Sequence, residues 1–398
     1  MQSVNLPQPT DIEKQHSEKL SALIAERIEQ AGGWICFADY MQLALYAPGL
    51  GYYSAGLHKF GEAGDFITSA EIGSLFARTL ARPLAQLLGD IPAASLLEFG
   101  AGSGQLAADL LAELNNMGQL PERYLIVELS AELRQRQQHT LQLQVPELLH
   151  CVHWLDQLPD TAQKLIVIAN EVLDAMPVTR FSIKDGKVYE LGVSLHQLED
   201  GPEGQHELQM QSRLADESLQ QQVEALQIET VPGVEYHSEI NQTIAPWLKS
   251  VAESIEQGAI YLIDYGYTRS EYYSAERHMG TFIGYYRHRA LDAPLWYPGL
   301  QDLTAFVDFT AVAEAALQAG LDVDGFTSQG NFLLDCGLTE VMQETDSAGE
   351  IEQLQLSQQM KTLSLPGEMG ERFKVIGLSK GLKQNVPGFS LRDLRYSL

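Results

Sequence analysis

Residues 96–106 read LLEFGAGSGQL, and this stretch decides the fold. A short apolar run ends at Glu98 and Phe99, and Gly100, Gly102 and Gly104 follow at alternate positions. From residue 106 onward, leucines recur at helical spacing. Glycines between a strand and a helix allow positive φ, and the new helix points unpaired N–H groups at whatever lies above the strand end. The stretch therefore predicts a cofactor pocket on an α/β sheet.

The glycines alone fit two cofactor classes. Gly102, Gly104 and Ala107 satisfy the G-x-G-x-x-G/A pattern of dinucleotide-binding folds. Glu98 extends the pattern to E-x-G-x-G-x-G, which resembles the first motif of class I methyltransferases, where the acid faces the amino-acid end of S-adenosylmethionine. Glu128 ends the next apolar run. An acid about 20 residues after the glycines can accept hydrogen bonds from ribose hydroxyls in either class.

A third apolar run, LIVIA at residues 165–169, is typical of a strand in the middle of a parallel sheet. Asn170, Glu171 and Asp174 follow it, and ligands bind beyond the carboxyl ends of such strands. Two carboxylates there favour a cationic acceptor, because a guanidinium carries five donors and pairs well with acids. The alternative is that Asp174 caps a helix and Glu171 is solvated.

A fourth apolar run at residues 259–263 ends at Asp264 and Tyr265. We expect Asp264 beside the carboxylates of the third strand, on the substrate side of the pocket. Tyr265 and Tyr52 either line the methyl-donor cavity or simply pack, since both are aromatic residues in glycine-containing segments.

Several longer segments match one family in its own order: residues 48–54, 60–69, 170–177, 263–266, 280–282, 285–288, 301–304, 307–309 and 369–375. On these segments the chain resembles the MidA-like methyltransferases (formerly DUF185), whose mitochondrial members act in assembly of respiratory complex I. The resemblance runs from about Trp34 to about Gly377, with a weak stretch between Lys184 and Gly233. Ile283 and Gly284 depart from a more polar family pattern.

The resemblance implies a class I methyltransferase fold, with a Rossmann-like, mostly parallel sheet and helices on both faces. It implies S-adenosylmethionine as cofactor and, for the mitochondrial members, methylation of a protein arginine. Asn170, Glu171 and Asp174 take the acceptor side. The cofactor side comprises Glu98, Gly100, Gly102, Gly104 and Glu128, with Asp65, Thr68 and Ser69 in a pocket lid.

Two other functions compete with this interpretation. A nicotinamide-dependent oxidoreductase would use the same glycine turn, but it needs a hydride-site acid such as a Tyr–Lys pair, and none is clearly placed. A non-catalytic assembly protein would keep the fold, yet a pure binder has no use for the constellation of Glu98, the glycines and Glu128.

The amino-acid composition limits the classes of partner and ligand that the protein can bind. A net charge of −27 argues against a nucleic-acid partner, because nucleic acids are bound through clustered Lys and Arg. The charge favours a partner protein with a basic surface, or it serves only to keep the protein soluble. The three cysteines show no C-x-x-C spacing and the histidines no H-x-x-x-H pair, so we expect no metal site. Isolated cysteines and the absence of a signal-like N-terminus favour a cytoplasmic protein. No apolar run is long enough to span a bilayer.

At 398 residues, two lobes are the expected organisation. The sequence predicts N-terminal helices and a glycine- and aromatic-rich lid over residues 1–92, then the first part of the cofactor-binding core over residues 93–183. An inserted hairpin with an acidic, Gln-rich segment follows over residues 184–258. The remainder of the core spans residues 259–380, and residues 381–398 form a loose tail.

Overall fold

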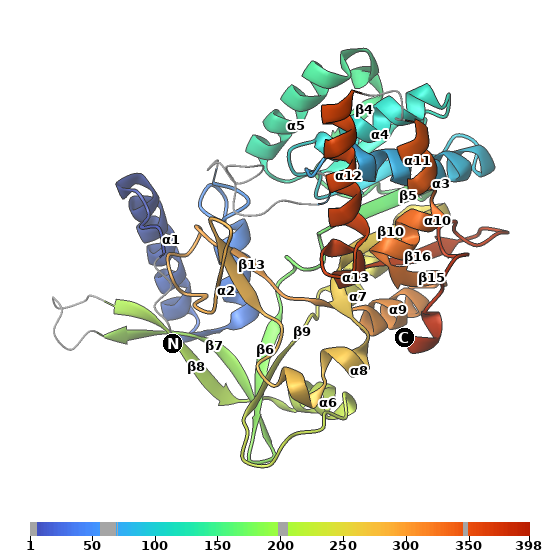
Figure 1. The fold of residues 1–398 in the computed structure, drawn as a ribbon. Helices are drawn as coiled ribbons and strands as arrows, with labels where there is room; N and C mark the ends of the chain where they lie inside the picture. Colours follow the sequence, from blue (N-terminus) through green and yellow to red (C-terminus); the bar gives the residue numbers. More distant parts are fainter. Residues whose placement is uncertain (1–5, 56–68, 70, 198–205, 345–348) are drawn as a thin grey trace. The chain divides into compact units, whose positions relative to one another are not determined.

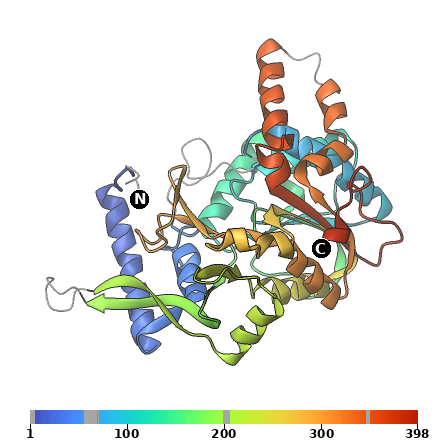
Figure 2. The same cartoon turned by 60° about the horizontal axis from the view of Figure 1, so that its bottom comes forward.

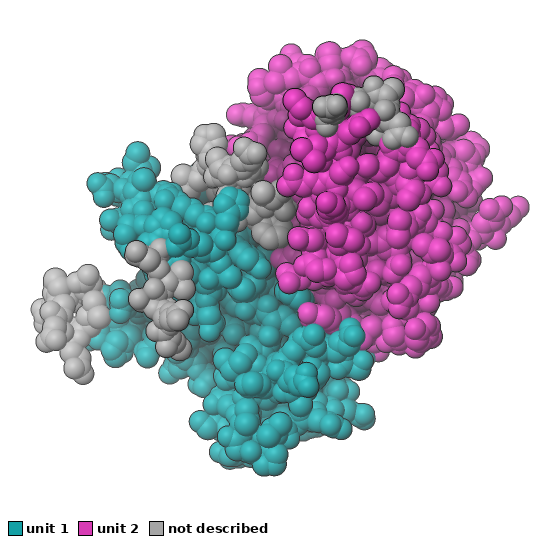
Figure 3. Space-filling view, in the orientation of Figure 1, with its two compact units in different colours: residues 1–66, 175–243, 269–306 teal, residues 67–174, 244–268, 307–398 magenta. Residues whose placement is uncertain are grey.

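The structure is a computed structural model, and it describes residues 6–55, 69, 71–197, 206–344 and 349–398. The chain forms two compact units, each built from three stretches of sequence (Figure 3). Unit 1 comprises residues 1–66, 175–243 and 269–306, and unit 2 comprises residues 67–174, 244–268 and 307–398. The chain therefore crosses between the units repeatedly, whereas the predicted segments follow one another in sequence order.

Unit 2 contains an eight-stranded sheet in the order β15-β16-β10-β5-β2-β3-β4, with β14 beside β10. In the sheet order, every neighbouring pair between β10 and β4 is parallel. Strand β16 is antiparallel to both of its neighbours, β10 and β15. The strands are β2 (Ser95–Phe99), β3 (Tyr124–Val127), β4 (Val152–Leu155), β5 (Gln163–Asn170), β10 (Ile255–Tyr267), β14 (Val307–Asp308), β15 (Asp322–Ser328) and β16 (Phe373–Lys380).

Helices cover both faces of this sheet (Figure 1). On one face α3 (Ser74–Asp90), α4 (Gln105–Asn116) and α5 (Ala131–Gln144) pack in a row. On the other, α7 (Ile244–Ser254) packs against α9 (Phe309–Gln318) and β10. Coverage of both faces explains why residues 165–169 are wholly apolar and fully buried. The mostly parallel, doubly covered sheet confirms the predicted fold class.

Four more α-helices of unit 2 are described. They are α10 (Gln329–Asp335), α11 (Leu338–Glu344), α12 (Glu350–Ser364) and α13 (Met369–Arg372). Helices α10 and α13 contact β15 and β16, while α11 and α12 contact α3. Helix α10 also contacts α11, α12 and α13, and Figure 2 shows this group of helices in orange and red.

The strand order of unit 2 defines where a ligand binds. The chain leaves β2 to form β3 and β4 on one side, and then returns to form β5 on the other side of β2. In open α/β sheets, the crevice at the carboxyl ends of the two strands flanking such a reversal holds the ligand. Here those ends carry the glycine turn after β2 and the segment 170–174 after β5.

The expected loose tail is wrong, because residues 381–398 pack onto unit 2. Val386 and Phe389 are buried, and the Phe389 ring stacks on Tyr261 at 6.5 Å between centroids. Gly325 and Gly377 make room for that ring, since a Cβ on either glycine would collide with it. Further on, the Asp335 carboxylate accepts hydrogen bonds from the backbone and hydroxyl of Ser390.

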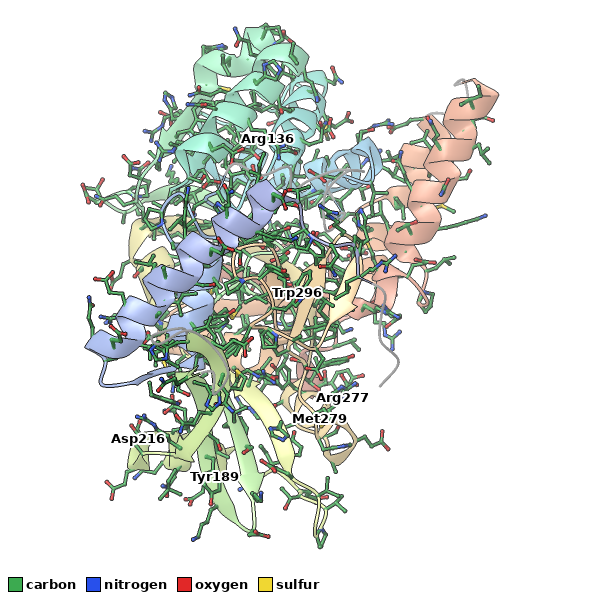
Figure 4. All side chains as sticks on the ribbon, turned by 90° about the vertical axis from the view of Figure 1, so that its left-hand side faces the viewer. Arg136, Tyr189, Asp216, Arg277, Met279 and Trp296 are labelled. Atoms are coloured by element: carbon green, nitrogen blue, oxygen red, sulfur yellow. The ribbon has the colours of Figure 1, made fainter. Side chains whose placement is uncertain are left out.

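Unit 1 is built on an antiparallel sheet in the order β1-β7-β6-β9, with β8 also paired to β7. Its strands are β1 (Trp34–Cys36), β6 (Thr179–Lys184), β7 (Lys187–Gln197), β8 (His206–Leu214) and β9 (Tyr236–Ile240). The predicted hairpin at residues 184–187 is confirmed, and Asp185 and Gly186 both take the positive φ of a tight turn. Figure 4 labels Tyr189 of β7 and Asp216, which follows β8 and is the N-cap of α6 (Glu217–Ala225).

This sheet corrects the expectation that residues 184–258 are an inserted hairpin and an acidic, Gln-rich segment. Strands β7, β8 and β9 are integral to unit 1, and Leu208 and Met210 of β8 pack against its core. Those two apolar residues alternate with polar ones, which is a strand pattern obscured by the surrounding glutamines.

The rest of unit 1 consists of helices and a small second sheet. Helix α1 (Asp11–Gln30) begins with a capping box between Thr10 and Glu13, and α2 (Phe37–Tyr46) packs against it. The second sheet has the order β12-β11-β13. Its strands are β11 (Ile283–Tyr286), β12 (Arg289–Leu291) and β13 (Asp302–Thr304). Helix α8 (Arg269–Tyr272) precedes them in the chain and belongs to the same unit.

Candidate cofactor and acceptor site

The glycine turn after β2 has the backbone that its sequence requires. Gly100, Gly102 and Gly104 have φ of 66°, 51° and 82°. A Cβ on Gly100 would lie 2.7 Å from Cγ2 of Val172, and one on Gly104 would lie 2.9 Å from Cα of Gln137. Gly104 is the N-cap of α4 and offers no capping side chain, so the first N–H groups of the helix remain suited to a ligand.

Glu128 lies just beyond the carboxyl end of β3 and is half-buried. Its Oε1 accepts a hydrogen bond from Ser130 N at 2.8 Å, and its Oε2 accepts one from Gln137 Nε2 at 3.0 Å. Burial raises the pKa of the Glu128 carboxyl above its ordinary value, and these hydrogen bonds together with the nearby Arg134 charge oppose the rise. Ser130 is also the N-cap of α5, since its Oγ accepts a hydrogen bond from Leu133 N.

We predict that Glu128→Ala weakens S-adenosylmethionine binding by about 1.5–3 kcal/mol, the cost of losing hydrogen bonds to a charged group. Adenosine should lose as much affinity as the whole cofactor, because the lost partner is on the ribose side. Isothermal titration with adenosine and with methionine separates the two halves. A comparable loss for methionine would show that Glu128 supports the local structure and not the ribose.

Gln137 was missed by sequence reasoning. It is fully buried on α5, where it lies between Leu133 and Leu141 at a spacing of four residues. Its Nε2 also donates to Gly102 O at 3.2 Å, and its Oε1 accepts from Trp154 Nε1 at 2.9 Å. A single polar residue within the apolar stripe of a helix was the signal available in the sequence.

Glu98 is buried at the carboxyl end of β2, beneath the glycine turn. Its Oε2 accepts a hydrogen bond from the Tyr124 hydroxyl at 2.8 Å, across from the neighbouring strand β3. Burial raises the pKa of Glu98 from 4.5 to about 7, and the Tyr124 hydrogen bond opposes the rise. Contact of this acid with the amino-acid end of the cofactor stays a prediction.

The raised pKa of Glu98 predicts a pH-dependent stability. Between pH 4.5 and about 7 the folded protein binds this proton more tightly than the unfolded chain, so the Glu98 contribution falls as pH rises through that window. Glu98→Gln removes the ionisation and keeps an acceptor for Tyr124. In urea unfolding we expect the variant to match the native protein at about pH 4, below both pKa values, and to exceed it by about 3 kcal/mol at about pH 8. An equal difference at both pH values would contradict the assignment.

The segment after β5 places a carboxylate in a strained backbone position. Glu171 has a φ of 54°, which is uncommon outside glycine, and its N–H donates to Ile263 O at 2.9 Å. Its Oε1 accepts hydrogen bonds from Ser69 N and Ser69 Oγ, both at 2.9 Å, and from Asn170 Nδ2 at 3.1 Å. Strain of this kind persists where several contacts fix a functional side chain.

Asp264, at the end of β10, lies next to this segment as predicted. It is fully buried, and its Oδ2 accepts hydrogen bonds from the N–H groups of Leu173 and Asp174 at 3.0 and 3.2 Å. Burial and the charges of Asp174 and Glu171 hold the pKa of Asp264 well above its usual value. Residues 171–178 contain no helix, so the alternative role of Asp174 as a helix cap is wrong.

The structure therefore brings most of the predicted residues together in unit 2. Ser69 lies against Glu171, whereas Asp65 and Thr68 lie outside the described residues. Tyr265 is buried with its ring edge-on to Phe373 at 5.3 Å. Tyr52 is buried in the core of unit 1, in edge contact with Tyr53. Both tyrosines thus pack against other aromatic rings, in agreement with the packing alternative.

The Gly-Thr-Phe segment at residues 280–282 has a structural role in unit 1. The fully buried Glu239 accepts hydrogen bonds from Thr281 N at 2.9 Å and Thr281 Oγ1 at 3.2 Å, and a Cβ on Gly280 would collide with its carboxylate. Phe282 lies under the Arg180 guanidinium at 4.7 Å. Figure 4 labels Arg277 and Met279 in the preceding segment, which pairs with β9 through a His237 N–H to His278 O hydrogen bond.

Comparison with known proteins identifies the family. The family model Methyltransf_28, of S-adenosyl-L-methionine-dependent methyltransferases, matches residues 75–327. The chain belongs to this family. It is thus a methyltransferase that uses S-adenosylmethionine, and the matched region contains the glycine turn, Glu128 and the segment after β5.

Relatives with known structures and curated names extend this result. A COG1565 superfamily member from Burkholderia thailandensis, solved bound to S-adenosyl-homocysteine, is 40% identical with a TM-score of 0.93, covering 99% of this chain and 100% of that one. The protein arginine methyltransferase NDUFAF7 of Danio rerio is 30% identical over 86% of this chain and 83% of its own length. The Homo sapiens protein of the same name is 28% identical over 87% and 80%.

These relatives also correct one expectation. The curated NDUFAF7 proteins from fish, fly and human are all named as mitochondrial, which contradicts the cytoplasmic location expected from the cysteines and the N-terminus. Among the described residues, no helix is both long and apolar enough to cross a membrane.

Proposed function

We propose that this methyltransferase modifies a nitrogen of a protein arginine side chain. The observation that carries the proposal is the group of acids at the carboxyl ends of β5 and β10, beside the glycine turn. Glu171 and Asp174 both lie close enough to Asp264 for their charges to raise its pKa. Such a group suits a guanidinium, which is cationic and presents several donors. The arginine methyltransferase names of the relatives support the same acceptor.

The residues of unit 2 fit S-adenosylmethionine. The glycine turn forms a cradle that a Cβ would fill at Gly100 and Gly104, next to the N-terminus of α4. Glu128 offers carboxylate oxygens on the ribose side, at the end of the strand beside β2. When bound, the cofactor supplies an electrophilic methyl group on a sulfonium, which is already a good leaving group.

The protein's own residues align the acceptor and accept its charge. Glu171, fixed by Ser69 and by the Ile263 carbonyl, holds the guanidinium so that one nitrogen attacks the methyl carbon in line. The N–CH3 bond forms as the S–CH3 bond breaks, and S-adenosylhomocysteine leaves. The methylated nitrogen then loses one proton, which a neighbouring carboxylate or water accepts after the transfer, so a strong general base is unnecessary.

Asp264 acts through the backbone in this scheme. By accepting the N–H groups of Leu173 and Asp174 it fixes the segment that carries Glu171 and Asp174. The strongly negative net charge of the chain favours an acceptor protein with a basic surface around the target arginine.

The acceptor class is tested with paired peptides. The protein is incubated with radiolabelled S-adenosylmethionine and basic peptides that contain one arginine, or lysine at the same position, and transfer is measured by scintillation and mass spectrometry. We expect methylation of the arginine peptides and at least tenfold less of their lysine partners, because lysine cannot bridge two carboxylates through a planar fork. Equal transfer to both, or transfer to lysine alone, would exclude a guanidinium site.

A further inference from the structure

Gln137 makes hydrogen bonds in two opposite directions from one buried amide. The indole N–H of Trp154 donates to its Oε1 at 2.9 Å. Because an indole nitrogen can only donate, the amide oxygen must face Trp154, and the amide nitrogen must face the other way. On that side Nε2 meets two acceptors, Gly102 O at 3.2 Å and Glu128 Oε2 at 3.0 Å. Trp154 therefore determines which end of the amide reaches the cofactor residues.

We propose that Gln137 is a positioning residue of the cofactor site, oriented by Trp154, that holds the Glu128 carboxylate for the ribose hydroxyls and ties it to the glycine turn. One amide group joins the turn after β2 to the acid after β3, and Trp154 on β4 fixes that group from the far side. Three adjacent strand ends thus contribute to one arrangement of acceptors.

Packing alone does not explain an amide at this position. Leu133 and Leu141 fill the neighbouring buried positions on the same face of α5, and an apolar side chain would fill this one as well. Helix α5 is also attached to the turn independently, since Thr140 Oγ1 donates to Ser103 O at 2.8 Å. A buried amide is costly unless all its polar atoms are paired, and here each of them is directed at a specific partner.

The charges around Glu128 leave this role to a neutral donor. Arg134 donates through Nε to the backbone carbonyl of Glu128 at 2.6 Å and pairs through its guanidinium with Asp156 at 2.7 Å. The carboxylate oxygens themselves receive Ser130 N and the Gln137 amide. A neutral donor orients the carboxylate without neutralising it, so its remaining lone pairs can still accept hydroxyl hydrogens.

The first test replaces Gln137 by methionine, which has a similar length and no donors. In isothermal titration we expect Gln137→Met to weaken S-adenosylhomocysteine and adenosine by about tenfold, the cost of one hydrogen bond to a charged group. Binding of 2′,3′-dideoxyadenosine should not change, since it lacks the 2′ and 3′ hydroxyls that Glu128 would bind. Gln144→Met is the matched control, because Gln144 lies on the same helix but is exposed and pairs with Gln105. Equal losses for adenosine and its dideoxy analogue would overturn the proposal.

The second test asks whether Trp154 acts through Gln137. Trp154→Phe should weaken S-adenosylhomocysteine less than Gln137→Met does, and the double variant should bind no more weakly than Gln137→Met alone. Losses that multiply would show two independent effects and contradict the proposal. Loss of the amide donor should also move the acid limb of the binding pH profile upward, because that hydrogen bond lowers the pKa of Glu128. An unchanged limb would contradict it too.

If Gln137→Met does not fold, Gln137→Glu takes its place. A carboxylate at this position keeps the shape but faces Glu128 Oε2 and Gly102 O, so the variant should bind more weakly than the native protein at neutral pH. Mild acid protonates the new carboxyl and restores a donor, so the ratio of native to variant affinity, measured at the same pH, should shrink on acidification. A ratio that does not depend on pH would contradict a role for the donor.

Discussion

Glu171→Gln is expected to reduce methyl transfer by at least a hundredfold while cofactor affinity stays within a few-fold of the native protein. The amide oxygen can still accept from Ser69 N and Oγ, so the local structure has a means to persist. The amide lacks the negative charge, and it presents two donors where a guanidinium needs acceptors. Loss of catalysis with intact cofactor binding identifies an interaction made with the acceptor.

The measurement for Glu171→Gln combines initial rates of label transfer with isothermal titration of S-adenosylhomocysteine. Glu122→Gln is the control, because Glu122 is an exposed carboxylate just before β3, at the amino-terminal ends of the parallel strands. This variant should have native activity. Normal methylation by Glu171→Gln, or poor cofactor binding, would mean that Glu171 does not hold a cationic acceptor.

Gly102→Val is expected to abolish detectable cofactor binding in a protein that remains folded. Gly102 has a φ of 51°, a conformation that β-branched residues strongly avoid. Relief of the strain would move the turn and with it Gly102 O, the acceptor of Gln137 Nε2. Even without that movement, the new side chain would enter the space beside the N-terminus of α4 that the cofactor needs.

Gly118→Val separates backbone strain from the effect on the pocket. Gly118 also has positive φ, at 67°, and a Cβ there meets nothing within 4 Å. It follows α4 in the same unit, away from the glycine turn. We expect the two variants to lose similar stability in thermal unfolding, with cofactor affinity lost only in Gly102→Val. Near-native binding by Gly102→Val would refute the assignment of the turn.

The sheet of unit 2 could be predicted because its strands have local signatures. The glycines after residue 99 and the wholly apolar runs at residues 165–169 and 259–263 each specify an element without reference to distant residues. Unit 1 was harder, since it is assembled from three separate stretches of chain. The pairing of β8 with β7 is set by tertiary packing of Leu208 and Met210, which glutamines and exposed polar residues surround in the sequence.

The residues of the candidate site also fall into a predictable and an unpredictable group. Glu128 and Glu171 were predictable because a strand end places them at the ligand edge of a parallel sheet. The helical spacing of Gln137 could have marked it as a buried polar residue, but its partners could not be predicted, because they depend on tertiary contacts between α5, β4 and the turn. The tail was misjudged because its anchor, the ring of Phe389, fits a surface that forms only when Gly325 of β15 and Gly377 of β16 pair in the folded sheet.

The most direct test is transfer of an isotopically labelled methyl group to proteins from a strain that lacks this chain. Extracts are incubated with deuterium-labelled S-adenosylmethionine and the native protein, Glu171→Gln or Glu122→Gln, and modified residues are located by mass spectrometry. We expect labelled methyl groups on the arginine of a specific acceptor with the native protein and Glu122→Gln, and none with Glu171→Gln. Label on another residue type, or label that does not depend on Glu171, would contradict arginine methylation at this carboxylate site.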